Sequence, residues 1–519
     1  MLNQGTAEQR YSRLEPDREP FLTRARDCSK LTIPSLMPPE GNTGSSYFHS
    51  PYQSVGAKGI KNLASSLLLT LMPPNDPFFR LTVPASLEDE IKEIESRPGG
   101  ETFRTDLDRT LAKVERQVQS AVESSGDRSD INEAFLHLLN EGNVLLTIFK
   151  EDTRVYHLDS YVCRRDRKGT LLELIIKETA SLQSLPDDFV EKITPRLKKA
   201  SADSGKDREV ELYTRVWRDG NWLHSRQEVA GGVVPGSEGK YKPESSPFIA
   251  LRFAKVSGQS YGRSYVEEFY GDLLSLEGLT RAIVESSAAA AKTLFMVDPN
   301  SITEIEDLTT AENLEFVTGS STDVSVLRMD KTGDFSVARA TADAIESRLE
   351  EAFLMRTSIQ RDAERVTAEE IRYMAGEIDD GLGGLFSLLA QEFQLPYIKR
   401  KMDTIAGLPK LPSLGIEPVI ITGLEALGRG QDLRKVERVM LGMAQVFGAE
   451  SVASRANFDV IASRYGAALG ADLSGLFKTQ QQLQMEAQQA QIAQAAAASA
   501  PGVAQELTKG AVAARQTPE

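Results

Sequence analysis

The sequence predicts an α+β protein that is mainly helical, and three patterns along the chain indicate this class. Helical segments broken by proline-rich turns occupy roughly the first 140 residues. Short runs rich in β-branched and aromatic residues follow, from Asn143 to about Ser257. Two long helical patterns that flank a small insert come next, beginning at Ser264 and near Phe335.

The first region contains one clear helix, from Gln53 to Leu71. Apolar residues recur there at helical spacing: Val55, Ile60, Leu63, Leu67 and Leu71. On either side lie "LTIPSLMPPEG" and "LMPPNDPFFRL", whose closely spaced prolines exclude a regular helix or a central strand. We therefore expect helices separated by proline-rich turns.

The second region contains the β-rich runs "NVLLTIF", "LLELIIKE", "VELYTRVW" and "FIALRFAKV". The polar segments "RDRKG" and "RDGNW" lie between such runs and have the composition of hairpin connections. Together with the helices before them, these runs predict an α+β domain.

Two long helices are predicted after this domain. The capping-box spacing of Ser264 and Glu267 marks the start of the first. Its apolar pattern runs into "SSAAAAKTLFMV" and stops at Asp298-Pro299, so we expect a helix over residues 264–298: Val266, Phe269, Leu273, Leu276 and Ile283. The second helix is expected from near Phe335 to about Met355, with one apolar stripe: Ala338, Ala342, Ile345, Leu349, Ala352 and Phe353.

The insert between these helices, Pro299 to Gly333, contains the alternating runs "LEFVTG" and "VSVLRM". Such alternation is typical of strands, so we expect a small α/β module here. Small residues that let backbones approach closely mark both flanking helices: Ser286 to Ala291, Ala338, Ala340, Ala342 and Ala344. They suit either a plain antiparallel hairpin within one monomer or side-by-side packing in an oligomer.

A third helix is expected in "ERVTAEEIRYMAGEIDDGLGG". Thr367 and Glu370 have the capping-box spacing, and Val366 and Ile371 occupy the flanking hydrophobic positions. Apolar residues then recur in steps of three and four, which places most of the carboxylates on the opposite face: Ile371, Met374, Ala375, Ile378, Leu382 and Leu385.

A metal site is the alternative interpretation of these clustered carboxylates. However, Asp379 and Asp380 diverge by about 100° around a helix, and Glu370 and Glu377 lie roughly 10 Å apart along it. We therefore expect a solvated helix face and no bound metal.

The C-terminal region has weaker patterns. The stretch "GLPKLPSLGIEP" interrupts the helical pattern, and Gln and Ala dominate from Thr479 to Ala500. That composition has a strong helix propensity but little bulk, so a helix there needs a surface to pack against.

Composition excludes several classes of site. The net charge is −15, from 75 acidic and 60 basic residues, so a surface that grips DNA is not expected. Cys28 and Cys163 are the only cysteines, which excludes a disulfide framework and a zinc site built on cysteine pairs. The four histidines lack ligand spacing, and we expect them to be packing or surface residues: His49, His137, His157 and His224.

The sequence also lacks the motifs of common enzymes. Its two Gly-Lys pairs are followed by Asp207 and Tyr241, so no phosphate-binding loop is present, and neither G-x-S-x-G nor H-E-x-x-H occurs. The N-terminus lacks the apolar core of a signal peptide, and the apolar stretch around Leu67 to Met72 is too short to span a bilayer. We expect a soluble, non-enzymatic chain without cofactors that is made in the cytoplasm.

Five stretches carry a resemblance to a known family: "REPFLTRARDCSKLTIPSLMP", "VGAKGIKNLASSLLLTLMPP", "GQSYGRSYVEEFYGDLLSLEGL", "RVTAEEIRYMAGEIDDGLGG" and "ITGLEALGRGQDL". They resemble, in the same order from Arg18 to Leu433, the portal proteins or head-to-tail connectors of short-tailed, podovirus-type bacteriophages. The resemblance implies a ring of twelve copies at one capsid vertex, around a channel through which double-stranded DNA is packaged and ejected.

The resemblance also implies a division of the chain. A peripheral wing covers residues 1–263, the two stem helices cover 264–298 and 334–356, and the clip covers 299–333 between them. A tunnel loop follows at 357–366, then a long wing and crown helix with the crown at 367–478, and an Ala- and Gln-rich barrel helix or tail at 479–519.

Site residues follow from the same resemblance. In the tunnel loop, Arg356, Gln360, Arg361 and Arg365 are expected to face DNA, although salt bridges to Asp362 and Glu364 are the alternative for some of the arginines. In the clip, the residues expected to bind partner proteins are Ile302, Glu304, Glu306, Asp323, Arg328 and Lys331.

The implied partners are further copies of the chain, double-stranded DNA bound without sequence specificity, the terminase large subunit, which is an ATPase, and the tail adaptor. Major capsid, scaffold and internal core or ejection proteins are implied as well, and no membrane. The expected location is the portal vertex of the virion, after assembly in the host cytoplasm.

Two alternatives remain at the level of the sequence. A DNA-processing enzyme requires a nucleotide-binding loop or metal-binding carboxylates, and the sequence supports neither. Another non-enzymatic head–tail protein, such as an adaptor or a scaffold, predicts no large central channel.

Overall fold

The structure, a computed structural model, describes residues 5–39, 41, 47–74, 78–84, 87, 91, 93–94, 103–150, 152–196, 209–290, 294–300, 304–314, 316–320, 322–327, 332–355, 385–405, 408, 416–420, 439–443, 445–446 and 448. The chain divides into two compact units, Met1–Leu424 and Glu425–Glu519. All elements discussed below belong to the first unit.

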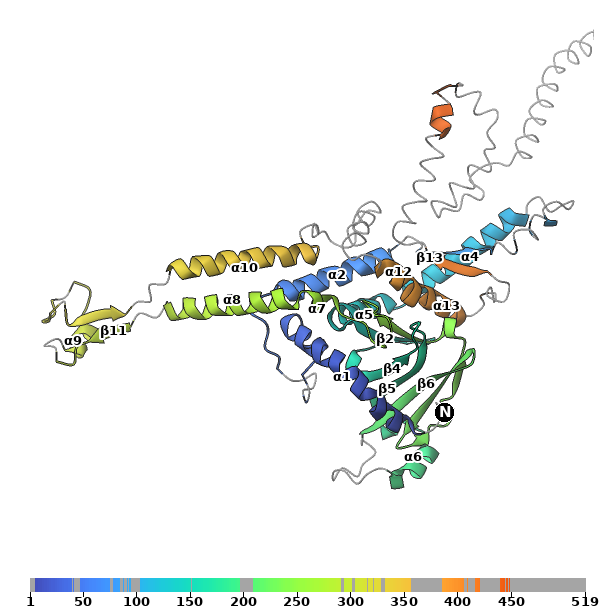
Figure 1. The fold of residues 1–519 in the computed structure, drawn as a ribbon, viewed down its shortest axis with the longest axis horizontal. Helices are drawn as coiled ribbons and strands as arrows, with labels where there is room; N and C mark the ends of the chain where they lie inside the picture. Colours follow the sequence, from blue (N-terminus) through green and yellow to red (C-terminus); the bar gives the residue numbers. More distant parts are fainter. Residues whose placement is uncertain are drawn as a thin grey trace, which may run out of the picture. The chain divides into compact units, whose positions relative to one another are not determined.

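The described residues of the N-terminal part include the helices α1 (Ala7–Leu31), α2 (Val55–Leu71), α4 (Phe103–Ser124) and α5 (Asp127–Glu141) (Figure 1). The predicted helix from Gln53 to Leu71 is confirmed as α2, and its five apolar positions are all buried. The proline-rich stretches on either side are confirmed as breaks, because α1 ends at Leu31 and α2 ends at Leu71.

The β-rich region forms two antiparallel sheets. A six-stranded sheet has the order β4-β5-β6-β7-β8, with β9 also paired to β7: β4 (Tyr161–Arg165), β5 (Leu171–Ser181), β6 (Glu209–Asp219), β7 (Trp222–Val229), β8 (Gly232–Val233) and β9 (Gly239–Tyr241). A three-stranded sheet has the order β10-β2-β3: β10 (Phe248–Arg252), β2 (Asn143–Ile148) and β3 (Thr153–Tyr156). Each of the four predicted runs contributes a strand, so this part of the prediction is confirmed.

Both predicted hairpin connections are confirmed. The segment "RDRKG" joins β4 to β5, and "RDGNW" joins β6 to β7. Asp219 pairs with Trp222 across the second turn, which leaves a two-residue loop in which Gly220 has φ +57°. Glycine and asparagine, which are the two residue types of this loop, adopt positive φ values most readily. A short helix, α6 (Asp187–Ile193), lies between β5 and β6.

The first long helix is shorter than predicted. It comprises α7 (Tyr265–Glu268) and α8 (Tyr270–Ala290), and the predicted cap at Ser264 is confirmed, since its hydroxyl accepts from the Glu267 N–H at 2.9 Å. The expectation of helix up to residue 298 is wrong, because Leu294–Val297 forms strand β11. These four residues pair antiparallel with β12 (Val324–Leu327), and this pairing with distant residues overrides the helical periodicity.

The insert therefore begins at Leu294 rather than at Pro299, and it contains the β11–β12 hairpin, which is not the one that alternation predicts. The run "VSVLRM" forms β12 as expected, whereas residues 314 and 316–319 of "LEFVTG" form no strand. Leu314 has φ +75°, a left-handed conformation that interrupts an extended chain. A short helix, α9 (Ile305–Thr310), lies between the two strands of the hairpin.

The second long helix is confirmed as α10 (Thr332–Ala352), within three residues of the prediction at each end. Leu349 and Phe353 of the predicted stripe are fully buried, and Ala342 and Ile345 are nearly so. The chain continues at α12 (Leu385–Leu389), a π-helical turn η6 (Ala390–Gln394), α13 (Leu395–Thr404) and β13 (Glu417–Ile420), which pairs with β1 (Phe79–Thr82).

One hydrophobic core joins these elements although they lie far apart in sequence. It contains residues of α2, α5, β2, α8, α10 and α13, with Leu63, Phe135, Leu146 and Phe393 fully buried within it. A second cluster, with Leu22 of α1 and Val216 of β6, lies between α1 and the two sheets.

Candidate functional site

The predicted channel residues lie outside the part of the chain that the structure describes. Arg356, Gln360, Arg361 and Arg365 fall within residues 356–384, as does the helix predicted from the capping box at Thr367. The structure does place the chain on both sides of this segment, at the end of α10 and at the start of α12.

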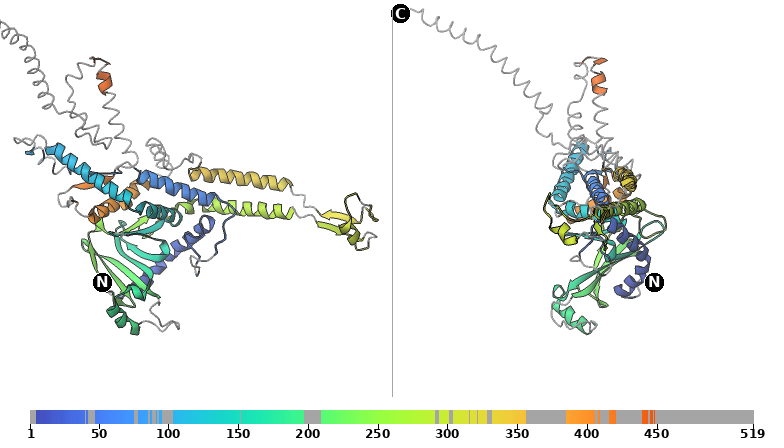
Figure 2. Two further views of the ribbon diagram at one scale, coloured as in Figure 1. Left: turned by 180° about the vertical axis from the view of Figure 1, so that it is seen from behind. Right: turned by 90° about the vertical axis from the view of Figure 1, so that its left-hand side faces the viewer.

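Helices α8 and α10 lie side by side and antiparallel (Figures 1 and 2). Leu273 and Leu276 of α8 belong to the same core as Ile345 and Leu349 of α10. An ion pair between Arg348 and Asp272, at 2.8 Å, joins the end of α10 to the start of α8. Both partners are partly exposed, so the shared apolar core, rather than this pair, holds the two helices together.

The small residues on these helices contribute little to the contact between α8 and α10. Ala342 is buried, but Ala288, Ala289, Ala340 and Ala344 are exposed in the single chain. Larger apolar side chains on the same two helices are also exposed: Leu274, Val284 and Val337. The pair thus leaves small and apolar side chains available for contact with another chain.

The insert is built on the β11–β12 hairpin. Its first turn is stabilised by Asp298, whose side chain accepts from the Asn300 N–H at 2.9 Å and whose own N–H donates to the Asp323 carbonyl at 3.0 Å. Of the predicted partner-binding residues, Glu304 and Glu306 are exposed and Asp323 is half-buried in the hairpin. Ile302, Arg328 and Lys331 lie outside the described residues.

Exposed apolar side chains are concentrated in the insert. Leu314 is 92% exposed and Phe316 is fully exposed, and Met296 and Ile305 are more than half exposed. Single exposed apolar residues are common on protein surfaces. Four within one small module, beside the carboxylates of Glu304 and Glu306, indicate a surface that binds another protein.

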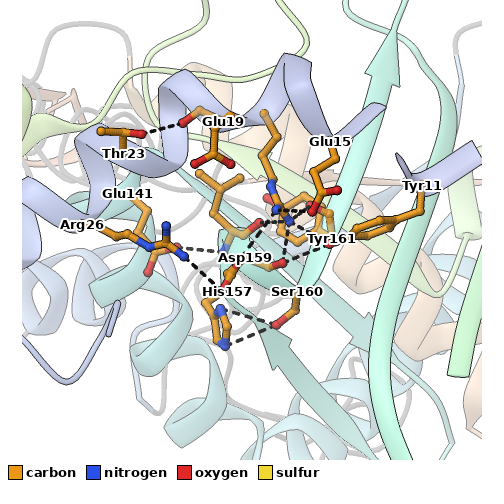
Figure 3. A network of polar contacts seen from close by, with 12 residues as sticks. Tyr11, Glu15, Glu19, Thr23, Arg26, Glu141, His157, Asp159, Ser160 and Tyr161 are labelled. Carbon is orange, nitrogen blue, oxygen red and sulfur yellow. Dashed lines mark hydrogen bonds and ion pairs between the residues drawn. The ribbon is translucent and has the colours of Figure 1, made fainter. Parts of the chain in front are cut away.

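A polar network fixes α1 to the connection between β3 and β4. Figure 3 shows Asp159, His157 and Ser160 of this connection close to Tyr11, Glu15 and Arg26 of α1. Arg18, which is almost fully buried, donates to the Asp159 carbonyl at 2.5 Å and to the Tyr11 hydroxyl at 2.8 Å. Arg18 and Arg26 also form ion pairs with the Asp159 carboxylate, at 3.5 and 3.6 Å.

Glu141 continues this network into α5. Its carboxylate accepts from the Leu158 N–H at 2.9 Å and contacts His137 Nδ1 at 2.5 Å. Burial alone lowers the pKa of His137, but the carboxylates of Glu141 and Glu133 outweigh burial and raise that pKa to about 10. Burial lowers the pKa of His157, whose ring centre lies 6.1 Å from that of His137. His137 is therefore a buried cation at neutral pH, and the neighbouring carboxylates balance its charge. A charge inside a protein needs such partners, which fits a structural role for His137.

The described residues do not assemble a catalytic site. Among them, no group of three or more His, Cys, Asp or Glu side chains could hold a metal ion. A shallow hollow of about 560 Å³ on α1 is lined by Glu15, Pro16, Glu19, Pro20 and Thr23, which offer no nucleophile paired with a base. In the part of the chain that the structure covers, no helix is both long and apolar enough to cross a membrane.

A family model and several individual relatives indicate the same family for this chain. The family described as bacteriophage head to tail connecting protein matches residues 4–476. The portal protein of Escherichia phage T7 is 39% identical over 523 residues, which cover 98% of this chain and 95% of that relative. The portal protein of Enterobacteria phage T3 is 38% identical over 97% of this chain and 94% of its own length. That of Pseudomonas phage phiKMV is 30% identical over 92% and 93%.

Proposed function

The chain belongs to the family of bacteriophage head to tail connecting proteins, and from this membership we propose that twelve copies of it close into a ring around the path of double-stranded DNA. It serves as a portal protein of a phage capsid, a structural connector between head and tail and not an enzyme. The match along nearly the whole chain is the observation that supports this function.

The two long helices supply the contacts for ring closure. In this proposal they are the stem, and the exposed small and apolar residues of α8 and α10 pack against the next copy. Heterologous contacts of this kind form a ring when the rotation between copies closes. The exposure of Ala288, Ala289, Ala340 and Ala344 in the single chain favours this use over a role inside one hairpin.

The acidic composition suits a conduit for DNA. Twelve chains of net charge −15 carry −180 in total, so most of the ring repels a polyanion. Each Lys or Arg that neutralises a phosphate adds salt-dependent affinity, which slows sliding. We expect a small number of basic contacts confined to the tunnel loop, residues 357–366, with Arg356 at its start.

The remaining partners follow from the position of the chain at the vertex. We propose that the clip, residues 299–333, binds the terminase large subunit during packaging and the tail adaptor afterwards, through residues that include Glu304 and Glu306. The wing, residues 1–263, is proposed to contact the capsid, and assembly takes place in the host cytoplasm with scaffold and internal core proteins.

The double variant Arg361→Ala with Arg365→Ala tests the conduit. Phosphate contacts carry no sequence information, as a channel that passes a whole genome requires. The variant should form normal rings with nearly unchanged thermal stability, yet alter the yield or the retention of packaged DNA in a reconstituted capsid assay. Replacement of both arginines by lysine should preserve much of the wild-type behaviour, because the charge is kept.

A matched control separates phosphate contact from a general effect on the loop. Asp362→Ala with Glu364→Ala removes two charges of the opposite sign from the same segment. Wild-type packaging and retention by well-assembled Arg361→Ala, Arg365→Ala rings would exclude these arginines from the mechanism. Loss of the ring would instead identify them as interface residues.

A further inference from the structure

Helix α2 binds the end of α10, just before residues 356–384. The Asn62 side-chain amide donates to the carbonyls of Phe353 and Leu354, at 3.1 and 3.2 Å. Both residues lie just beyond Ala352, the last residue of α10, at the end of a helix where carbonyls need partners from outside the helix. Leu354 has φ +52°, a left-handed residue of the type that ends helices.

The packing around Phe353 fixes the same point. Its ring is fully buried and lies against Gly59 of α2, where an added Cβ would come within 2.4 Å of the ring. The Tyr265 hydroxyl donates to the Ala352 carbonyl at 2.6 Å, and the Tyr265 ring packs edge-on against Phe353. These contacts therefore fix the end of α10 against α2. They involve Gly59, the Asn62 amide and the rings of Tyr265 and Phe353.

The other end of α2 binds the chain soon after residue 384. Gln394 of η6 is fully buried, and its side chain donates to the Leu71 carbonyl at 2.7 Å. Arg128 donates to the next carbonyl, that of Met72, at 2.7 Å. Asn62 and Leu71 are nine residues apart, so the two attachment points lie about 14 Å apart along α2.

We propose that α2 positions both ends of residues 356–384, and we call this role of α2 the seat. It sets where the chain leaves α10 and where the chain rejoins the body. Gly59 and Asn62 are the positioning residues at the first of these points. Both ends of residues 356–384 are tied to one rigid helix, so the spacing of those ends does not depend on the path between them. This inference rests on the proposed function, because that segment carries the arginines expected to face DNA.

The variant Asn62→Asp tests the seat. It keeps the shape of the side chain but replaces the donating amide by a carboxylate that faces two carbonyl oxygens. Two hydrogen bonds are lost, so opening at the end of α10 should become roughly tenfold more frequent. Trypsin should cleave assembled rings faster by that factor after Arg356, Arg361 and Arg365, while cleavage after Arg167 in the β4–β5 hairpin stays unchanged. Ser65→Ala, at an exposed position one turn further along α2, is the matched control.

A second pair of variants protects the test against simple misfolding. Gly59→Ala should also accelerate cleavage, because its Cβ displaces the Phe353 ring. Adding Phe353→Leu to Gly59→Ala removes the ring atoms that clash and should bring the rate back toward that of the wild type. A further rise in rate on adding Phe353→Leu would contradict the specific contact.

The outcomes separate the seat from the proposed function. Unchanged cleavage in Asn62→Asp rings, or an equal rise at Arg167, overturns the positioning role and leaves the DNA channel untouched. Faster local cleavage with wild-type DNA retention supports the seat and argues against a DNA-contacting role for the segment. Faster local cleavage with altered retention supports both.

Discussion

At the scale of single residues, the charge of His137 is set by the carboxylates beside it. It follows Glu133 and precedes Glu141 by four residues each, so both carboxylates lie on its side of α5. The spacing of these three residues can be read from the sequence. Their burial, which makes the spacing matter for the pKa of His137, cannot. The sequence suggests only a packing or surface residue, and the structure adds its burial and the carboxylates that hold its charge.

His137 makes the folding stability of the chain depend on pH. Its folded pKa, about 10, lies above the ordinary value of 6.5, so its contribution is fully present below about pH 6.5 and is lost as the pH rises toward 10. The variant His137→Gln should be less stable than the wild type at neutral pH, and the difference should shrink as the pH approaches 10. Thermal unfolding across this pH range checks the prediction, with His49→Gln, at an exposed position, as the control. An equal difference at every pH would contradict it.

At the scale of elements, helices were predictable where the pattern is local. Helix α2 and helix α10 each carry an apolar stripe over several turns, and the Val, Ile, Leu and Phe side chains of these stripes are buried in the structure. Strand β11 was missed because Leu294–Val297 continues a helical pattern, and its partner β12 lies about thirty residues further on. The pairing of β1 with β13 joins Phe79 to Ile420, a separation over which sequence patterns carry no signal.

The role of α2 as the seat could not be predicted from the sequence either. Gly59 and Asn62 look like weak helix residues, since glycine and asparagine both lower helix propensity. Their use becomes visible only when Phe353, almost three hundred residues later, is placed against them. By contrast, the position of the insert between two long helices could be predicted from their apolar patterns, although its first boundary could not, because α8 ends at Ala290 and not at Pro299.

The insert should bind partners as a separable element. Removing Leu294 to Leu327 and joining the helices through a short Gly-Ser linker deletes both strands of the hairpin, so no unpaired edge remains. We expect ring formation to survive, because the buried residues of α8 and α10 belong to the main core, and pull-down of both the packaging ATPase and the tail adaptor to be lost. Retained binding of either partner would count against a shared site.

Point variants in the insert give a finer test. Leu314→Asp with Phe316→Asp should weaken partner binding about tenfold or more while leaving the fold unchanged, since both side chains are exposed and make little contribution to stability. Asn313→Asp adds a carboxylate at an exposed neighbouring position without removing an apolar group. Equal effects of Asn313→Asp and the double variant would mean that charge, and not apolar contact, governs binding.

At the scale of the whole molecule, the chain combines a large apolar core with a strongly acidic net charge. A charge of −15 on one chain is tolerable, but adding like charges in a ring costs free energy unless the contacts between copies are close and apolar. The exposed faces of α8 and α10 have that character, with alanines and with Leu274, Val284 and Val337. Because salt screens repulsion between exposed charges, assembly should strengthen with ionic strength.

The purified protein should therefore be a closed ring with a mass many times the 57.0 kDa of one chain, and more complete at higher salt. Light scattering coupled to chromatography measures the mass, and negative-stain images show whether an axial hole is present. Leu274→Glu with Val284→Glu should shift the population toward smaller species without changing the helical content, because both side chains are already exposed in the single chain. Thr322→Glu, which adds a carboxylate at an exposed position of the insert, should leave the mass unchanged. A stable monomer under all salt conditions would rule out the ring, and with it the use of the α8 and α10 faces as its contacts.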